Sequence, residues 1–147
     1  MDRIIERLNA LGLAVPDESS VGCSTTHCRR AGHLLFVSGI CSGEQMIATS
    51  EKDTETLYSI GQNLALRMLA NIRDEVGDLH HVTQVVKATI FVHAKHGFSQ
   101  MPAAAHGFSD VFTVAYGEKG RHARAAMGAA ALAGNAALLA EIIVEVR

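Results

Sequence analysis

The stretch that decides the fold is VTQVVKATIFVH, residues 82–93. It is rich in β-branched residues, which favour β-strands. Its apolar residues alternate, so that Val86, Ala88, Ile90 and Val92 share one face. Segments with apolar residues at helical spacing flank it on both sides. The pattern predicts a sheet whose strands are connected by helices.

Two amphipathic helices are expected on either side of this strand. The apolar face of the first consists of Leu57, Ile60, Leu64, Met68, Ile72 and Val76. That helix is expected to begin at an Asp53 cap and to stop at Gly77. The apolar face of the second consists of Phe98, Met101, Ala105, Phe108 and Phe112. Ser99 is its expected cap, and Pro102 falls in its first turn, where a missing N–H costs little.

The rest of the chain supplies strands at both ends of the sheet. Residues 33–39 (HLLFVSG) are predicted to form a buried strand, with residues 45–48 as its short antiparallel partner. The polar segment 17–28 before them is expected to be a loop. Near the end of the chain, two strands flank Gly134–Asn135, where a glycine at the first central position fits a type II′ hairpin turn.

A short amphipathic helix over residues 4–13 precedes these elements. The expected order is therefore β-β-α-β-α-β-β after a leading helix, within one domain over residues 1–147. Such an order predicts an α+β fold with two helices packed on one face of the sheet. The small residues of RAAMGAAALAG (124–134) permit a second sheet to approach the uncovered face, which suggests an oligomer.

Composition limits the classes of function. Among 147 residues, 48% are hydrophobic, which excludes a disordered chain. A net charge of −2 and 5% aromatic residues argue against binding of nucleic acid. Three cysteines without a CxxC pair suit a reducing cytoplasm. No signal peptide and no apolar run of about 18 residues occurs, so we expect a soluble, cytoplasmic protein.

The segment GRHARAAMG, residues 120–128, contains the strongest candidate for a binding group. In a strand, Arg124 shares its face with small residues only, namely Ala126, Gly128 and Ala130. A guanidinium above such a depression suits a small carboxylate, because it offers two parallel donors. Alternatively, an ideal hairpin would set Arg124 opposite Glu145 in an ordinary ion pair. Spacing alone leaves both interpretations open.

Glu141, within ALLAEIIVEV, is the second candidate. A partly buried carboxylate there would hold and polarise a water molecule, whereas an exposed one would merely solvate a strand at the edge of the sheet. The eight histidines do not match the spacing of a metal site, so no metal is expected.

The motifs HLLFVSG, VVKATIFVH, GRHARAAMG and a closing VEV strand resemble the RidA/YjgF family, also called endoribonuclease L-PSP-like, and are nearest to an uncharacterised RidA-like subgroup. The resemblance implies a chorismate-mutase-like fold and a homotrimer with a cleft at each subunit interface. It also implies hydrolysis of reactive enamine or imine intermediates, such as 2-aminoacrylate, to 2-oxo acids and ammonia. No metal or organic cofactor is implied.

The resemblance also assigns roles to individual residues. Arg124 matches the arginine that grips the substrate carboxylate, and Glu141 matches the acid that positions the water. Ser38 and Gly39 match positions that line the same cleft. His106 stands near the place of a family asparagine and is expected to give the cleft a titratable donor.

Three positions depart from the family pattern. Thr25 stands where active deaminases have a tyrosine, Ala126 stands where they have a cysteine, and an asparagine is replaced near Pro102 or His106. These departures keep open a second hypothesis, a non-catalytic module that binds a small carboxylate metabolite. The older family name suggests a third hypothesis, RNA cleavage in which His122 does acid–base work.

Overall fold

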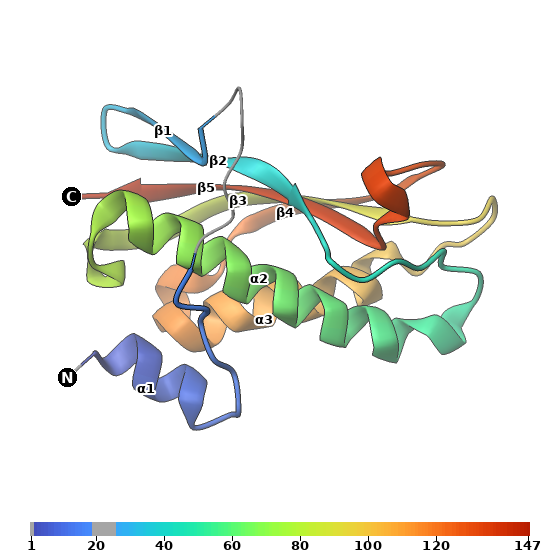
Figure 1. Ribbon diagram of the computed structural model, residues 1–147, viewed down its shortest axis with the longest axis horizontal. Helices are drawn as coiled ribbons and strands as arrows, with labels where there is room; N and C mark the ends of the chain where they lie inside the picture. Colours follow the sequence, from blue (N-terminus) through green and yellow to red (C-terminus); the bar gives the residue numbers. More distant parts are fainter. Residues whose placement is uncertain (1, 19–25) are drawn as a thin grey trace.

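A computed structural model of the chain describes residues 2–18 and 26–147 (Figure 1). Helix α1 (Arg3–Asn9) comes first, followed by strands β1 (Cys28–Ala31) and β2 (Leu34–Cys41). Helix α2 (Thr54–Val76), strand β3 (Val82–His93) and helix α3 (Met101–Tyr116) follow. Strands β4 (Ala123–Ala129) and β5 (Leu138–Val146) end the fold. The predicted order of elements and the α+β class are confirmed.

The five strands form one mixed sheet in the order β1-β2-β5-β3-β4. Only β3 and β4 are parallel, as the intervening helix α3 requires. Helices α2 and α3 cover one face of the sheet, and α1 packs on the outer side of this helix layer (Figure 1). No helix within the described ranges is long and apolar enough to cross a membrane.

The last two strands do not form the predicted hairpin. Strand β3 lies between them, because β4 follows β3 through a helical crossover and β5 pairs with β2 on one side and β3 on the other. The φ angle is positive at both Gly134 (62°) and Asn135 (56°), which a type II′ turn does not have. β5 therefore lies inside the sheet and has a hydrogen-bonded neighbour along each edge.

The partner predicted for the strand at residues 33–39 is also wrong. β2 pairs with β1, from Cys28 opposite Val37 to Ala31 opposite Leu34, through a tight turn in which Gly32 has a φ of 62°. Residues 45–48 make only isolated bridges to other segments. Strand β2 is buried on its helix side alone, so that Phe36 is 44% exposed.

Three local expectations change as well. The Asp53 carboxylate accepts bonds from the backbone N–H groups of Thr49 and Ser50, so it closes a capping box before α2 rather than capping α2 itself. Gln100, not Ser99, occupies the N-cap position of α3, without a side-chain bond. A bulge after Val85 makes Val85, rather than Val86, the buried residue in β3.

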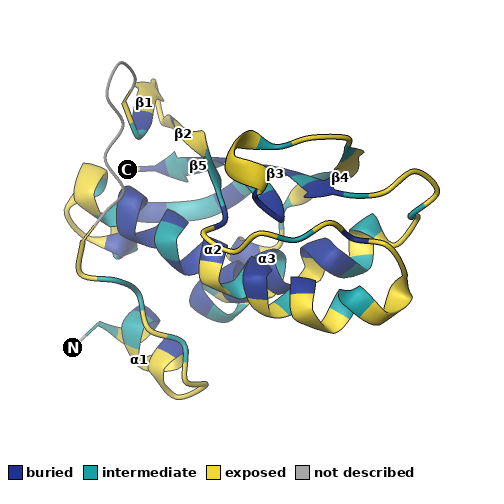
Figure 2. Cartoon of the chain, turned by 45° about the vertical axis from the view of Figure 1, so that its right-hand side comes forward, coloured by how far each residue is buried: buried dark blue, intermediate teal, exposed yellow. Residues whose placement is uncertain are grey.

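The core lies between the sheet and the helices (Figure 2). Two glycines allow α2 and α3 to approach closely. A methyl group at Gly107 would lie 1.9 Å from the Tyr58 carbonyl oxygen, and one at Gly61 would lie 2.9 Å from the Phe108 nitrogen. This contact fixes α3 against the core, and α3 carries two of the side chains that surround Arg124.

Candidate functional site

Arg124 lies on the edge strand β4 and is held by two side chains of α3. Its Nη1 atom is 3.2 Å from Ser109 Oγ and 3.2 Å from His106 Nδ1. Within residues 2–18 and 26–147 it forms no ion pair with a carboxylate. The alternative pairing with Glu145 is wrong, because β4 and β5 are not neighbours. Hydrogen bonds from Thr83 and Gln84 instead lower the pKa of Glu145.

His122 is linked to Arg124 through Ser109, whose hydroxyl contacts both side chains. Its Nδ1 is 2.7 Å from the Gly120 carbonyl oxygen, which only accepts, so Nδ1 carries the proton. Burial, and then the positive charge of Arg124, lower the pKa of His122, while the bond to Gly120 opposes this shift. The ring is therefore neutral at pH 7, and Nε2 accepts from the Ser109 hydroxyl at 3.0 Å.

These bonds form a chain in which every donor is determined. Arg124 donates to Ser109, Ser109 donates to His122, and His122 donates to Gly120. Arg124 also donates to His106 Nδ1, because a guanidinium only donates, so Nδ1 is the acceptor nitrogen of this ring. Both Nη1 hydrogens of Arg124 are thus used. The edge formed by Nε and Nη2 makes no hydrogen bond to any described residue and suits a bidentate carboxylate.

A hollow of about 310 Å³ lies beside this guanidinium, and we call it the Arg124 hollow. Its lining consists of His106, Ser109, Thr113, Arg121, His122 and Arg124. Gly120 is buried, and a methyl group on it would lie 2.0 Å from the Phe112 carbonyl oxygen. The absence of a side chain at Gly120 therefore allows the segment before β4 to pack closely against α3.

Glu141, Ser38 and Gly39 meet elsewhere, on the face of the sheet that no helix covers. A β-bulge brings them together: Val37 pairs with Ile142 and Ile40 with Ala140, so Ser38 and Gly39 both lie opposite Glu141. The Ser38 hydroxyl donates to the Thr26 carbonyl oxygen at 2.6 Å.

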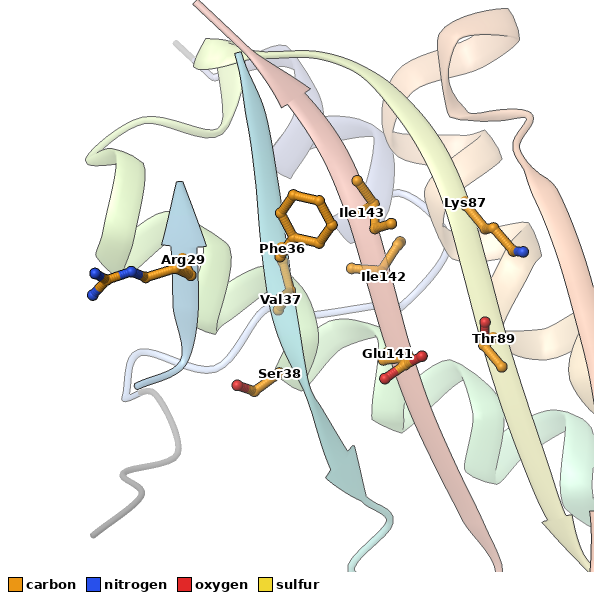
Figure 3. Close-up of a pocket in the computed structure, with 9 residues that line it drawn as sticks. All are labelled: Arg29, Phe36, Val37, Ser38, Lys87, Thr89, Glu141, Ile142 and Ile143. Carbon is orange, nitrogen blue, oxygen red and sulfur yellow. The ribbon is translucent and has the colours of Figure 1, made fainter. Parts of the chain in front are cut away.

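The bulge borders a second hollow, of about 460 Å³, which we call the open-face hollow (Figure 3). Ser38, Glu141 and Thr89 lie side by side there on three neighbouring strands, with the helices behind the sheet. The full lining is Arg29, Phe36, Val37, Ser38, Lys87, Thr89, Glu141, Ile142 and Ile143. Lys87 and Thr89 were not among the residues expected from the sequence.

The two groups of predicted site residues occupy opposite faces of the sheet. Glu141 pairs with Thr89, whereas Arg124 pairs with Ala88, the next residue along β3, and successive side chains of a strand point to opposite faces. Arg124 and His106 therefore lie on the helix side, and Glu141 with the bulge lies on the open side. Ala126 shares the face of Arg124, while Thr25 falls outside the described residues.

The open face also carries exposed apolar side chains. Leu34, Phe36 and Met127 are 36%, 44% and 42% exposed on it. The partly buried Leu139, Ile143 and Phe91 belong to the same face according to the strand register. An exposed patch of this kind marks an interaction surface in proteins.

One group of metal-ligating side chains occurs in the described part of the chain. Ligand atoms of Asp2, Asp78 and His80 lie within 4.8 Å of one another. Local hydrogen bonds account for this arrangement: Asp2 accepts from the Ile4 N–H at the start of α1, and Asp78 accepts from the N–H of His80. The cluster lies apart from both hollows.

Two known proteins are similar to this chain over nearly its whole length. No family model matches it. Protein TCP17 of Trypanosoma cruzi is 29% identical over 150 residues, which span 97% of this chain and 94% of that protein. Atu1372 of Agrobacterium tumefaciens, a solved structure of unknown function, is 30% identical with a TM-score of 0.85, over 99% of this chain and 92% of that one.

The fold is that of the proteins to which the sequence motifs point. A putative endoribonuclease from Shewanella oneidensis superposes with a TM-score of 0.85 at 21% identity, over 97% of this chain and 99% of that one. Structures named L-PSP endoribonuclease and RidA share the same fold at lower identity. The predicted resemblance to the RidA/YjgF proteins and their chorismate-mutase-like architecture is confirmed at the level of the fold.

Proposed function

This chain belongs to the family of Atu1372 and has the RidA fold, and on that premise we propose that it hydrolyses small reactive imines and enamines to 2-oxo acids and ammonia. A substrate such as 2-aminoacrylate carries a carboxylate beside the reacting carbon. The enzyme therefore needs a cationic group that orients this carboxylate and a second group that directs water to the carbon.

The state of Arg124 carries the proposal. A partly buried arginine usually pairs with a carboxylate of its own chain, but this one is bound through Nη1 to the hydroxyl of Ser109 and the imidazole of His106. Its Nε–Nη2 edge is left for a ligand. A bidentate arginine–carboxylate contact contributes about 2–4 kcal/mol of binding free energy and fixes the plane of the substrate.

Glu141 is the group to which we assign the water, and it must come from a second copy of the chain. One protomer holds Arg124 and Glu141 on opposite faces of its sheet, so the two side chains meet only where copies associate. Association through the open face would cover Leu34, Phe36 and Met127. We propose a homotrimer in which each interface combines one Arg124 hollow with the bulge and Glu141 of the neighbouring copy.

The chemistry that this site must perform is modest. 2-Aminoacrylate first gains a proton from solvent at its terminal carbon and becomes the protonated imine. Water then adds to the imine carbon while one of its protons passes to Glu141. Glu141 then returns that proton to the nitrogen of the carbinolamine. The carbon–nitrogen bond breaks and ammonia leaves, while the hydroxyl oxygen loses its proton to solvent and forms the carbon–oxygen double bond of pyruvate. No electron transfer is involved.

We propose the cytoplasm as the location of this reaction.

RNA cleavage receives less support from the site. The hypothesis requires His122 to exchange a proton with a ribose hydroxyl, but Ser109 and Gly120 occupy both of its ring nitrogens. A binding module without catalysis would use the same Arg124 contact. Turnover therefore distinguishes this second hypothesis from the first.

A coupled assay tests the proposal. A dehydratase generates 2-aminoacrylate, and the release of pyruvate is followed with and without this protein. We expect acceleration by the parent protein, a loss of about 30-fold or more in Arg124→Ala, and parent activity in Arg3→Ala, which removes an exposed guanidinium of α1. An Arg124→Ala protein as active as the parent would refute the carboxylate contact. Binding of 2-oxo acids without any turnover would favour the binding module.

A further inference from the structure

The Arg124 hollow is unusual in the chemistry of its lining. All six lining side chains are hydrogen-bonding groups, comprising two guanidiniums, two imidazoles and two hydroxyls. None is a carboxylate. Both guanidiniums are charged at every physiological pH. A ligand with a single carboxylate neutralises only one of them, so the hollow is built for more than one negative charge.

Arg121 is the second guanidinium, and its contact with the protein is weak. Its ion pair is with Glu118 at 3.4 Å, and the side chains of the pair are 70% and 85% exposed. Exposed pairs of this kind contribute about 0–1 kcal/mol. An anion that enters the hollow therefore replaces Glu118 as the partner of Arg121 at little cost.

Arg124 and Arg121 can bind different anionic groups of one ligand, because only one edge of the Arg124 guanidinium is free of hydrogen bonds to described residues. Ser109 and His106 occupy Nη1, so Arg124 has one bidentate edge and accommodates one carboxylate. A second anionic group of the same ligand must find another cation. Arg121 is the other permanent cation in the lining. A volume of about 310 Å³ is ample for a chain of four or five carbon atoms.

We propose that the site prefers dicarboxylates, so that the imine of a 2-amino dicarboxylic acid is a better substrate than a short imine such as that formed from 2-aminoacrylate. Arg124 binds the carboxylate beside the reacting carbon, and Arg121 binds the distal one. Because this inference rests on the proposed deaminase, the reaction itself is unchanged: water adds to the imine carbon and ammonia leaves.

Binding of two product analogues tests the selection. 2-Oxoglutarate and 2-oxovalerate have the same five-carbon chain and differ in the distal carboxylate. Calorimetry at low ionic strength should give the parent protein a Kd about tenfold lower for 2-oxoglutarate. Arg121→Gln should reduce this ratio to about two or less, mainly by weakening the binding of 2-oxoglutarate. Arg3→Gln is the matched control and should keep the parent ratio, since Arg3 lies on α1.

Each remaining outcome has a definite meaning. Equal affinities for the two acids in the parent, or a preference that survives in Arg121→Gln, would overturn dicarboxylate selection and leave the deaminase proposal standing. Inorganic phosphate that displaces 2-oxoglutarate at equal concentration would show unselective anion binding and overturn the inference. Failure of the parent to bind either acid would refute the Arg124 carboxylate site, and the inference with it.

Discussion

Replacing Ser109 with alanine tests the hydrogen-bond chain that holds Arg124. The hydroxyl accepts from Arg124 at 3.2 Å and donates to His122 at 3.0 Å. A neutral hydrogen bond contributes about 0.5–1.5 kcal/mol to stability, and one to a charged group contributes about 1.5–3 kcal/mol. Because Ser109 is only partly buried, the lower part of each range applies. We expect Ser109→Ala to lower the free energy of unfolding by about 2 kcal/mol.

Urea unfolding followed by circular dichroism measures this change, and steady-state kinetics measures its consequence. The control is Ser99→Ala, an exposed serine before α3, which should change stability by less than about 0.5 kcal/mol. Because Ser109 positions Arg124, the Ser109→Ala variant should also raise KM by about tenfold while kcat changes little. A Ser109→Ala protein with the stability of the Ser99→Ala control and the parent KM would refute the chain as the support of Arg124.

Three further changes test other parts of the structure. Gly107→Ala places a methyl group 1.9 Å from the Tyr58 oxygen and should lower the free energy of unfolding by about 3 kcal/mol, whereas Gly128→Ala, with space for its methyl group, should be near neutral by the same urea measurement. The lowered pKa of His122 means that the folded chain binds fewer protons than the unfolded chain, so the melting temperature should fall as the pH decreases below 6.5, and His122→Gln should reduce this slope. Phe36→Glu charges the open face and should shift the mass found by light scattering to that of one chain, whereas an unchanged trimer mass would exclude this face as the interface.

Local patterns predicted the elements of the fold better than their neighbours in the sheet. Strand β3 has the predicted limits, Val82 and His93, because alternation and β-branching act within one segment. The pairing of β5 is wrong in the prediction because proximity in sequence favours a hairpin with β4. Pairing of both edges of β5, with β2 and with β3, is a property of the whole sheet, which no short segment encodes.

In the candidate site, too, the sequence predicted local features better than contacts between elements. Strand alternation correctly places Arg124 and Ala126 on one face, but the partner expected for Arg124 depended on the wrong pairing. Ser109, the side chain that joins Arg124 to His122, was missed, although its position three residues after His106 puts both on one side of α3. The bulge that places Ser38 and Gly39 opposite Glu141 depends on the register between β2 and β5. In the sequence, Gly39 is the only sign of a bulge at this point.

The opposite placement of Arg124 and Glu141 has a genetic consequence. In the homotrimer that we propose, a chain altered at one of these residues still contributes an intact half to its neighbour, so we expect two inactive variants to complement each other when their subunits are exchanged. In equimolar mixed trimers of Arg124→Ala and Glu141→Gln, about a quarter of the interfaces combine two undamaged halves and recover activity. On this proposal, activity depends on the assembled trimer, because each site takes its two groups from different chains.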